Sequence, residues 1–178
     1  MIVYTVGHST LSLDEFLARL RAHGVAGIAD VRRFPASRRH PQYGRDRLAP
    51  ELERHGIRYD WLEALGGRRA PRPDSPHAGW RVAGFRGYAD YMDGNQFASA
   101  LAALLDLGGA RATAIMCAEA VPWRCHRQLV ADALVARGVE VRHILGREAA
   151  EPHRLTAFAR VVGERLVYDG AQGRLRGV

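Results

Sequence analysis

The 178-residue sequence predicts an α/β fold, a single domain in which helices flank a mostly parallel β-sheet. Three observations lead to this prediction. Short apolar runs typical of buried strands alternate with segments whose apolar residues recur at helical spacing. The first part of the chain reads as strand, capped helix and strand, a βαβ unit that makes two strands parallel. We find no internal repeat and no sign of a second domain, so the predicted domain spans residues 1–178.

The N-terminal βαβ unit has clear boundaries in the sequence. Residues 2–6 form an apolar run that we expect to be the first strand. Ser12 is placed to cap the next helix, and Glu15, three residues later, completes a capping box. Gly24 is expected to end that helix, and residues 25–31 to form the second strand of the parallel pair.

The middle of the chain is less regular. Residues 32–47 hold six arginines together with prolines and show no periodicity, so we predict a loop. A short helix is expected over 47–55, with Pro50 in its first turn, where proline is tolerated. Residues 57–62 have strand character, and residues 66–87 read as a long loop of the kind that often binds ligands.

The second half continues the alternation of strands and helices. Its apolar spacing predicts a helical region at 88–92 and a helix from Phe97 that ends at Gly108–Gly109. Strands are expected at 112–117 and 140–145, and the helix between these two strands is expected to end at Gly138. A short helix at 155–162 and a last strand at 165–168 complete the prediction. The order of the strands in the sheet does not follow from these patterns.

Both cysteines lie in the segment 112–137, which we predict to carry the functional site. Cys117 is expected to close a buried strand. Cys125 is expected in the first turn of the following helix, on its core-facing side next to His126. The positive end of a helix dipole lowers the pKa of a thiol in that position. Ligands of parallel sheets bind outside the carboxyl ends of the strands, where this segment would place these side chains.

The turns after the strands bring further polar residues to the same edge of the predicted sheet. His8 and Ser9 follow the first strand, while Asp30 and Arg32 end the second. Asp30 is expected either to act as a base or to cap the loop and pair with Arg32. Glu119 joins this edge from the turn that follows the strand at 112–117.

Three interpretations of the two cysteines stay open. In the first, Cys125 or Cys117 is a nucleophile and His126 or Glu119 transfers protons. In the second, these four residues bind a metal, although they lack the Cys-x-x-Cys spacing usual for zinc, so we predict no metal. In the third, both cysteines are small core residues, and Glu119, His126 and Arg127 form an anion-binding pocket without a thiol role.

The charge balance favours anionic partners. The formal net charge is +7, and all 26 basic residues are arginine, whose planar donors suit phosphate and carboxylate. A solvated basic surface is the alternative interpretation.

No apolar run has the length of a membrane span and the N-terminus has no signal-peptide pattern, so we expect a cytoplasmic protein with reduced thiols and no membrane partner.

An anion is expected at the start of the helix that follows Pro122. Proline fits an early helical position, and the next amides have no partner within the helix. No residue that typically caps a helix immediately precedes Pro122, so Glu119, a bound anion or water must accept these bonds. We expect the anion beside Cys125 and His126, within reach of Arg32.

Several motifs taken together resemble the family known as domain of unknown function 488. They are Thr5 to Ser9, Asp30 to Arg32 with Pro35 and Ser37, Leu65 to Arg68, Phe85 to Met92, Met116 to Glu119, and Cys125 to Arg127. The resemblance runs from about residue 2 to residue 168. It implies a small cytoplasmic α/β protein of bacterial type, and it brings no established reaction.

These observations favour an enzyme that acts on a phosphate-bearing substrate, either a nucleotide or a nucleic acid. The catalytic candidates are Asp30, Glu119, Cys125 and His126. The residues expected to hold the anion are His8, Ser9, Arg32, Ser37, Arg38 and Arg127. The alternatives are a non-catalytic module that binds an anion or nucleic acid, and a thiol redox protein that uses Cys117 and Cys125. No cofactor is predicted, and the oligomeric state is left open, a homo-oligomer included.

Overall fold

A computed structural model describes residues 1–163 and 165–170. Its strands are β1 (Ile2–Gly7), β2 (Gly27–Asp30), β3 (Arg58–Trp61), β4 (Thr113–Cys117), β5 (Glu140–Ile144), β6 (Glu151–Pro152), β7 (Arg160–Val162) and β8 (Arg165–Val167). The first six form one sheet in the order β3-β2-β4-β1-β5-β6. Strands β1 to β5 are parallel and β6 is antiparallel, while β7 and β8 make a separate antiparallel pair. The predicted α/β fold with a mostly parallel sheet is confirmed.

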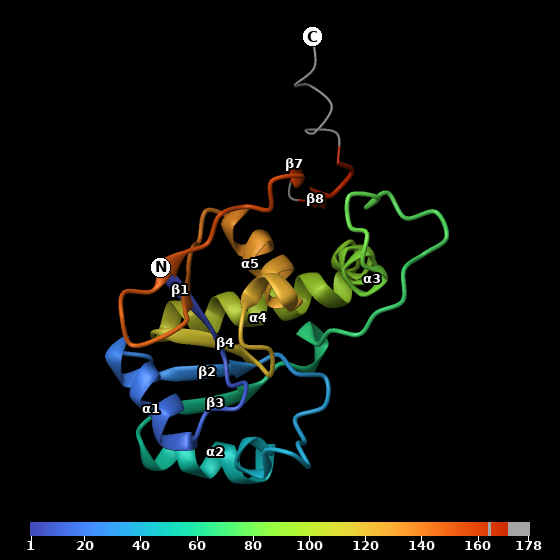
Figure 1. Ribbon diagram of the computed structural model, residues 1–178. Helices are drawn as coiled ribbons and strands as arrows, with labels where there is room; N and C mark the ends of the chain where they lie inside the picture. The colour runs from blue at the N-terminus through green and yellow to red at the C-terminus, as the bar shows by residue number, and fades with distance from the viewer. Residues whose placement is uncertain (164, 171–178) are drawn as a thin grey trace.

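Helices cover both faces of the sheet (Figure 1). The helices are α1 (Leu13–Ala22), α2 (Arg45–Arg54), α3 (Ala83–Met92), α4 (Asn95–Ala110) and α5 (Arg127–Val135). Side chains of α1 and α2 share one buried cluster with Val6 and Ile28 of the sheet. Side chains of α3, α4 and α5 share a second cluster with Val3 and Ile115. Because successive strand residues point to opposite faces, each strand feeds both clusters.

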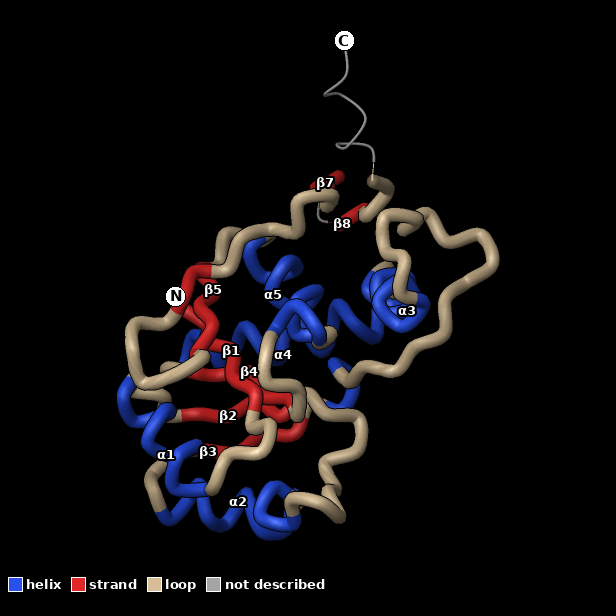
Figure 2. The backbone as a smooth tube through the Cα atoms, in the orientation of Figure 1, coloured by secondary structure: helices blue, strands red, loops and turns tan. Residues whose placement is uncertain are grey.

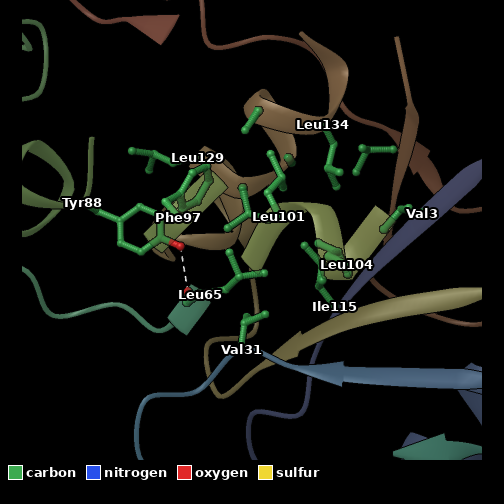
Figure 3. Packing of buried hydrophobic residues seen from close by; sticks show 14 of the residues in the cluster. Val3, Val31, Leu65, Tyr88, Phe97, Leu101, Leu104, Ile115, Leu129 and Leu134 are labelled. Atoms are coloured by element: carbon green, nitrogen blue, oxygen red, sulfur yellow. Dashed lines mark hydrogen bonds between the residues drawn. The ribbon is translucent and has the colours of Figure 1, made fainter. Parts of the chain in front are cut away.

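The larger buried cluster, which contains side chains of α3, α4 and α5, fixes the position of the elements around the candidate site. Figure 3 shows Leu101 and Leu104 of α4 packed between Leu134 and the sheet residues. At one end of the same cluster, the Tyr88 hydroxyl donates a hydrogen bond of 2.7 Å to the carbonyl of Leu65. This bond satisfies the only polar atom of a fully buried ring. It also fastens η2 (Glu63–Leu65), a short 3-10 turn after β3, to α3.

The N-terminal βαβ unit agrees with its sequence signals. The Ser12 hydroxyl accepts a hydrogen bond from the Glu15 amide, and the Glu15 carboxylate accepts one from the Ser12 amide, so the capping box is present. Gly24 follows the end of α1 with a φ of +62°, a conformation that suits glycine. Local side-chain to backbone bonds therefore set these boundaries.

The carboxyl ends of the parallel strands meet at one edge of the sheet, as expected. Gly7 of β1 pairs with Cys117 of β4, and Asp30 of β2 pairs with Met116 of β4. Two long loops leave this region, over residues 31–40 and 66–82, and are drawn in tan on the right of Figure 2. The sheet edge, these loops and the turn after β4 together frame the candidate site.

Two predicted boundaries around the middle helices are wrong. Pro50 is the sixth residue of α2, not a first-turn residue, because the helix already begins at Arg45 and is held by buried Leu48 and Leu52. The α4 helix runs through Gly108 and Gly109 to Ala110. A side chain at Gly108 would come within 3.0 Å of Val3, so this glycine serves close packing against β1 and not helix termination.

The predicted helix at 155–162 is absent, and residues 160–162 form β7 instead. The helix-like spacing of Leu155 and Phe158 reflects packing on the larger cluster, where Phe158 contacts Trp80 edge to face. Thr156 is bound through its amide and its hydroxyl to the Asp132 carboxylate, which holds this segment in an irregular conformation.

The helical region predicted at 88–92 begins earlier, at Ala83. Within the described part of the chain, no helix has both the length and the apolar character needed to span a membrane.

The prediction that Cys125 lies in the first turn of the helix after Pro122 is wrong. Pro122 opens a separate 3-10 turn, η3 (Pro122–Arg124), whose last bond runs from the Cys125 amide to the Pro122 carbonyl. Cys125 then has an extended backbone, with φ of −135° and ψ of 148°. His126 occupies the N-cap position and α5 begins at Arg127. The apolar spacing that suggested a longer helix is produced by two short elements in sequence.

Candidate functional site

The predicted site residues form two groups on opposite faces of the same sheet edge. Asp30 shares its strand parity with Ile28 and therefore lies on the side covered by α1 and α2. Cys117 shares its parity with Ile115 and lies on the side of α3, α4 and α5, in the same cluster as Cys125. The structure thus brings the thiols together and places Asp30 in a different environment.

The first group is centred on a buried ion pair between Asp30 and Arg32. Arg32 Nη2 donates to Asp30 Oδ2 at 2.5 Å, and its Nε donates to Oδ1 at 2.9 Å. Tyr59 adds a hydroxyl bond of 2.6 Å to Oδ2, and the Arg32 amide donates to Oδ1. Asp30 is 0% exposed, and both of its oxygens are occupied. The pair closes the carboxyl end of β2 and connects it to the following loop.

His8 joins this group as a neutral ring. Its ring stacks on Tyr43 with centroids 4.0 Å apart, and its Nδ1 lies 3.0 Å from the Ser9 carbonyl, to which it donates. Its Nε2 then accepts from Arg32 Nη1 at 3.3 Å. Burial, and next the positive charge of Arg32, lower the pKa of His8 to about 4. Burial lowers the pKa of Arg32, but the bonds and charge of Asp30 outweigh this and keep the guanidinium firmly protonated.

The second group contains both thiols and an imidazole. Cys125 Sγ lies 3.7 Å from His126 Nδ1, and His126 Nε2 lies 3.0 Å from the Val31 carbonyl oxygen. Because a carbonyl can only accept, the His126 Nε2 carries the proton, and Nδ1 faces the thiol. The sulfur of Cys117, at the end of β4, lies within 4.8 Å of the Cys125 sulfur. The end of β4 and the start of α5 thus bring the two sulfurs and the His126 ring together, and the turn after β2 holds that ring.

The surroundings shift the pKa values of the two thiols in opposite directions. The hydrogen bond from Cys117 lowers the pKa of Cys125 well below that of an ordinary thiol, although burial opposes this, and His126 and Arg127 add to the lowering. The same sulfur contact, together with burial, raises the pKa of Cys117. When one proton is shared between the two sulfurs, Cys125 therefore carries the negative charge. An acidic thiol beside a histidine is the pattern of an activated nucleophile.

The thiol group also offers donor atoms of the kind that bind zinc. In the described part of the chain, ligand atoms of Cys117, Cys125 and His126 lie within 4.8 Å of one another. Structural zinc sites use four such ligands. Glu119, which the sequence hypothesis counted as the fourth, is not part of this group and lies exposed in the turn after β4. The structure therefore brings together three of the four ligands that the metal-binding interpretation requires.

Arg127 is buried instead of lining the mouth of the helix. It is 1% exposed, and its Nη2 donates to the carbonyls of Glu119 at 2.5 Å and Ala120 at 3.4 Å. Its Nη1 donates to the Thr5 hydroxyl at 3.4 Å. The guanidinium thus fastens the turn after β4 to β1. The amides of residues 128–130 donate to the carbonyls of Cys125 and His126, so internal bonds occupy this helix start.

The remaining predicted anion-binding residues lie around the edge without joining either group's centre. Ser9 has a positive φ of 46°, and its amide donates to Ala118, which links the turns after β1 and β4. The Ser37 hydroxyl accepts from the His40 amide at 2.9 Å within the loop after β2. Arg38, in the same loop, is exposed. These three residues shape the rim of the site.

The sequence reasoning missed a buried chain of hydrogen bonds beside the thiol group. Thr5 donates to His143 at 2.7 Å, His143 donates to His153 at 3.0 Å, and His153 donates to the Asp132 carboxylate at 2.8 Å. Arg127 donates to Thr5 at the other end, so the chain supports the residue that holds the turn after β4. One signal was available, because Asp132 lies on the apolar side of α5, three residues after Leu129.

The two buried neutral histidines predict that acid destabilises the protein. Burial is the main cause that lowers the pKa of His8 and of His143 from 6.5 to about 4 in the folded chain. Unfolding returns both to their ordinary values, so the unfolded state binds more protons between these limits. Stability should be constant above pH 6.5, fall as the pH decreases toward about 4, and then level off with respect to these groups. Urea unfolding at a series of pH values measures this.

A matched variant separates this effect from general acid denaturation. His143→Gln should show a smaller loss of stability over the same pH interval, because one of the two groups no longer takes up a proton on unfolding. A wild-type stability that stays level or rises as the pH falls through this interval would contradict the assignment of His8 and His143 as neutral buried rings.

Comparison with protein families gives one match. Residues 12–134 match the model of the family described as domain of unknown function DUF488. The matched region contains Asp30, Arg32, both thiols and Arg127, whereas His8 lies before it. Comparisons with curated proteins and with solved structures give no match.

Proposed function

The chain belongs to the DUF488 family, and from its sheet-edge geometry we propose that it is a thiol-dependent enzyme acting on a phosphate-bearing substrate, a nucleotide or a nucleic acid. One observation carries the proposal: Cys125 Sγ faces His126 Nδ1 at 3.7 Å, while Val31 fixes the other ring nitrogen at 3.0 Å. A nucleophile, a base and a group that orients the base are the parts of covalent catalysis.

The chemistry assigns one task to each side chain. In the resting site the proton of Cys125 has passed to His126, and the thiolate attacks the phosphorus of the substrate phosphate. The bond from the phosphorus to the leaving oxygen breaks, and the oxygen takes the proton from His126. Water, deprotonated by His126, afterwards attacks the phosphorus of the phosphocysteine intermediate, and the S–P bond breaks to release the Cys125 thiolate. Cys117 keeps the resting thiolate stable by donating its S–H, while its own proton stays in place.

The other predicted residues support this centre without touching the reacting atoms. Asp30 and Arg32 hold the turn that carries Val31, the partner of His126. Arg127 holds the turn at Glu119 and Ala120 through backbone carbonyls. They are positioning residues in this proposal. Glu119 has an exposed carboxylate in that turn, where it would meet substrate before Cys125 does.

Access to the sulfur requires a local movement. Cys125 is only 3% exposed. Gly67 lies against the His126 ring so closely that a side chain there would come within 2.9 Å of Nδ1. Gly67 belongs to the 66–82 loop, and loops without regular structure open more readily than packed strands. We expect this loop to move when substrate enters.

A screen for hydrolysis and group transfer tests the function. Nucleotides and short DNA and RNA strands would be offered to the wild type and to Cys125→Ser, and quenched samples would be analysed by mass spectrometry for a covalent adduct on Cys125. We expect turnover by the wild type alone and an adduct on Cys125. Substrate binding with no turnover and no adduct would identify a binding module and reject the enzyme.

The contact between the two sulfurs favours one alternative, a thiol redox protein. There, Cys125 would attack a disulfide of another protein, and Cys117 would resolve the mixed disulfide. The two functions differ in their dependence on Cys117. A redox protein loses its turnover in Cys117→Ser and exchanges with added disulfides, whereas the turnover of the proposed hydrolytic centre falls by no more than about tenfold in that variant.

A further inference from the structure

An exposed aromatic ring with two guanidinium groups stands beside the thiol site. Phe34 is 61% exposed, the largest exposure among the exposed large apolar side chains that the structure describes. The guanidinium carbons of Arg33 and Arg68 lie 5.6 Å and 6.0 Å from its ring centroid. Arg33 also donates to the Arg68 carbonyl at 3.0 Å, so the two loops that carry this group are joined. We call Phe34, Arg33 and Arg68 the rim cluster.

The rim cluster is connected to the thiol site through both of its loops. Val31, three residues before Phe34, accepts the bond from His126. Gly67, one residue before Arg68, lies against the ring of the same histidine. Gly66 packs on Arg33, where a side chain would come within 2.8 Å of the Arg33 Cβ. A ligand on the rim cluster is therefore held by the segments that position His126.

The charges on this rim have no counter-ion within the described chain. No carboxylate of residues 1–163 or 165–170 forms an ion pair with Arg33, Arg38, Arg39, Arg45, Arg47 or Arg68. Only Asp46 adds negative charge to the segment 32–47. Two guanidinium groups on one ring repel each other unless an anion lies between them. The surface therefore suits a ligand with negative charges at repeated intervals.

A second aromatic and arginine pair extends the surface. The Arg45 guanidinium lies 4.7 Å from the ring centroid of Trp61, and the Trp61 Nε1 donates to the Arg32 carbonyl at 2.9 Å. Trp61 is thus anchored to the loop that carries Phe34. Aromatic rings alternating with cationic side chains are how proteins bind unpaired bases together with the phosphates between them. Duplex nucleic acid hides its base faces and cannot use such rings.

We propose that the rim cluster and its neighbouring arginines bind single-stranded nucleic acid, with one base stacked on Phe34. This inference rests on the proposed function, since it names a single strand as the substrate class of the same site. Arg33 and Arg68 contact the phosphates on either side of the stacked base. The exposed arginines of the 32–47 segment follow the strand beyond it.

Binding measurements in Cys125→Ser test the inference without any thiol chemistry. The probe is a labelled oligothymidylate of about twelve nucleotides, and fluorescence anisotropy would be recorded over a series of salt concentrations. Replacing Phe34 by alanine should weaken binding about tenfold or more, with the salt slope unchanged. Phe34→Trp should restore it. Arg68→Gln should weaken binding and reduce the salt slope by about 0.7, the share of one phosphate contact.

Controls decide between a stacking site and a general basic surface. Val82, which is 58% exposed and not aromatic, is the apolar control position, and Val82→Ala should bind like the parent. The inference is overturned if the oligonucleotide does not bind at low salt, if Phe34→Ala binds normally, or if duplex DNA binds equally well. It is also overturned if ATP shows the same dependence on Phe34 and longer strands bind no more tightly. None of these outcomes depends on whether Cys125 is a nucleophile.

Discussion

Replacing Asp30 by alanine is expected to destabilise the protein by about 3–5 kcal/mol, the usual cost of removing one partner of a buried ion pair. Arg32 is 6% exposed and would be left charged with its main acceptor gone. Tyr59 would lose its acceptor as well. The large effect arises from these uncompensated groups, since the intact pair itself contributes little net stability. Urea unfolding at neutral pH measures the change.

Two further variants test this explanation. The exposed pair of Arg142 and Glu140 is nearly as short, with a nitrogen–oxygen distance of 2.6 Å against 2.5 Å for Arg32 and Asp30, yet Glu140→Ala should cost less than about 1 kcal/mol because water screens both charges. The double variant Asp30→Leu with Arg32→Met removes both buried charges and should recover part of the lost stability. An Asp30→Ala protein as stable as the Glu140→Ala protein would show that the pair does not hold this end of β2.

Replacing Cys125 by serine is expected to lower kcat on the substrate found in the screen by about a thousandfold or more. A serine hydroxyl keeps the shape of the side chain, but it does not ionise near neutral pH. His126→Gln should cost between about 100- and 10,000-fold, the range for losing a general acid and base. Steady-state rates of purified variants, checked for folding by circular dichroism, measure both effects.

The control for this prediction is the neighbouring cysteine. Cys117→Ser retains a hydroxyl donor toward Cys125, so the rate should fall by no more than about tenfold. Equal losses in both cysteine variants would instead indicate that the two sulfurs act as a redox pair. Activity of Cys125→Ser within a few-fold of the wild type would remove the nucleophile from the proposal.

The sequence predicted the parts of the fold that depend on local signals. The capping box at Ser12 and Glu15 and the apolar runs of β1, β4 and β5 were sufficient, because each signal lies within a few residues of the element it defines. The common edge for Asp30 and Cys117 followed from the prediction of a largely parallel sheet, in which the carboxyl ends of the strands lie together. These predictions required no knowledge of distant contacts.

The arrangement within the site depended on contacts that no local pattern encodes. Whether Asp30 and Cys117 share a face is decided by which helices cover each side of the sheet, and the sequence does not state this. The partner of Arg127, Thr5, lies 122 residues away, so an arginine that looked like an anion ligand is in fact buried. The irregular backbone of Cys125 arises from the 3-10 turn at Pro122, which resembles the start of a helix in sequence.

The proposed function depends most directly on Cys125 ionising well below an ordinary thiol, and a titration of the native protein tests this. Ultraviolet absorbance of the thiolate reports ionisation without requiring a reagent to reach a sulfur that is 3% exposed. We predict that one thiol ionises well below the ordinary thiol pKa of 9.0, and that this step disappears in Cys125→Ser. A first ionisation at or above that value, or a low step that persists in Cys125→Ser, would contradict it.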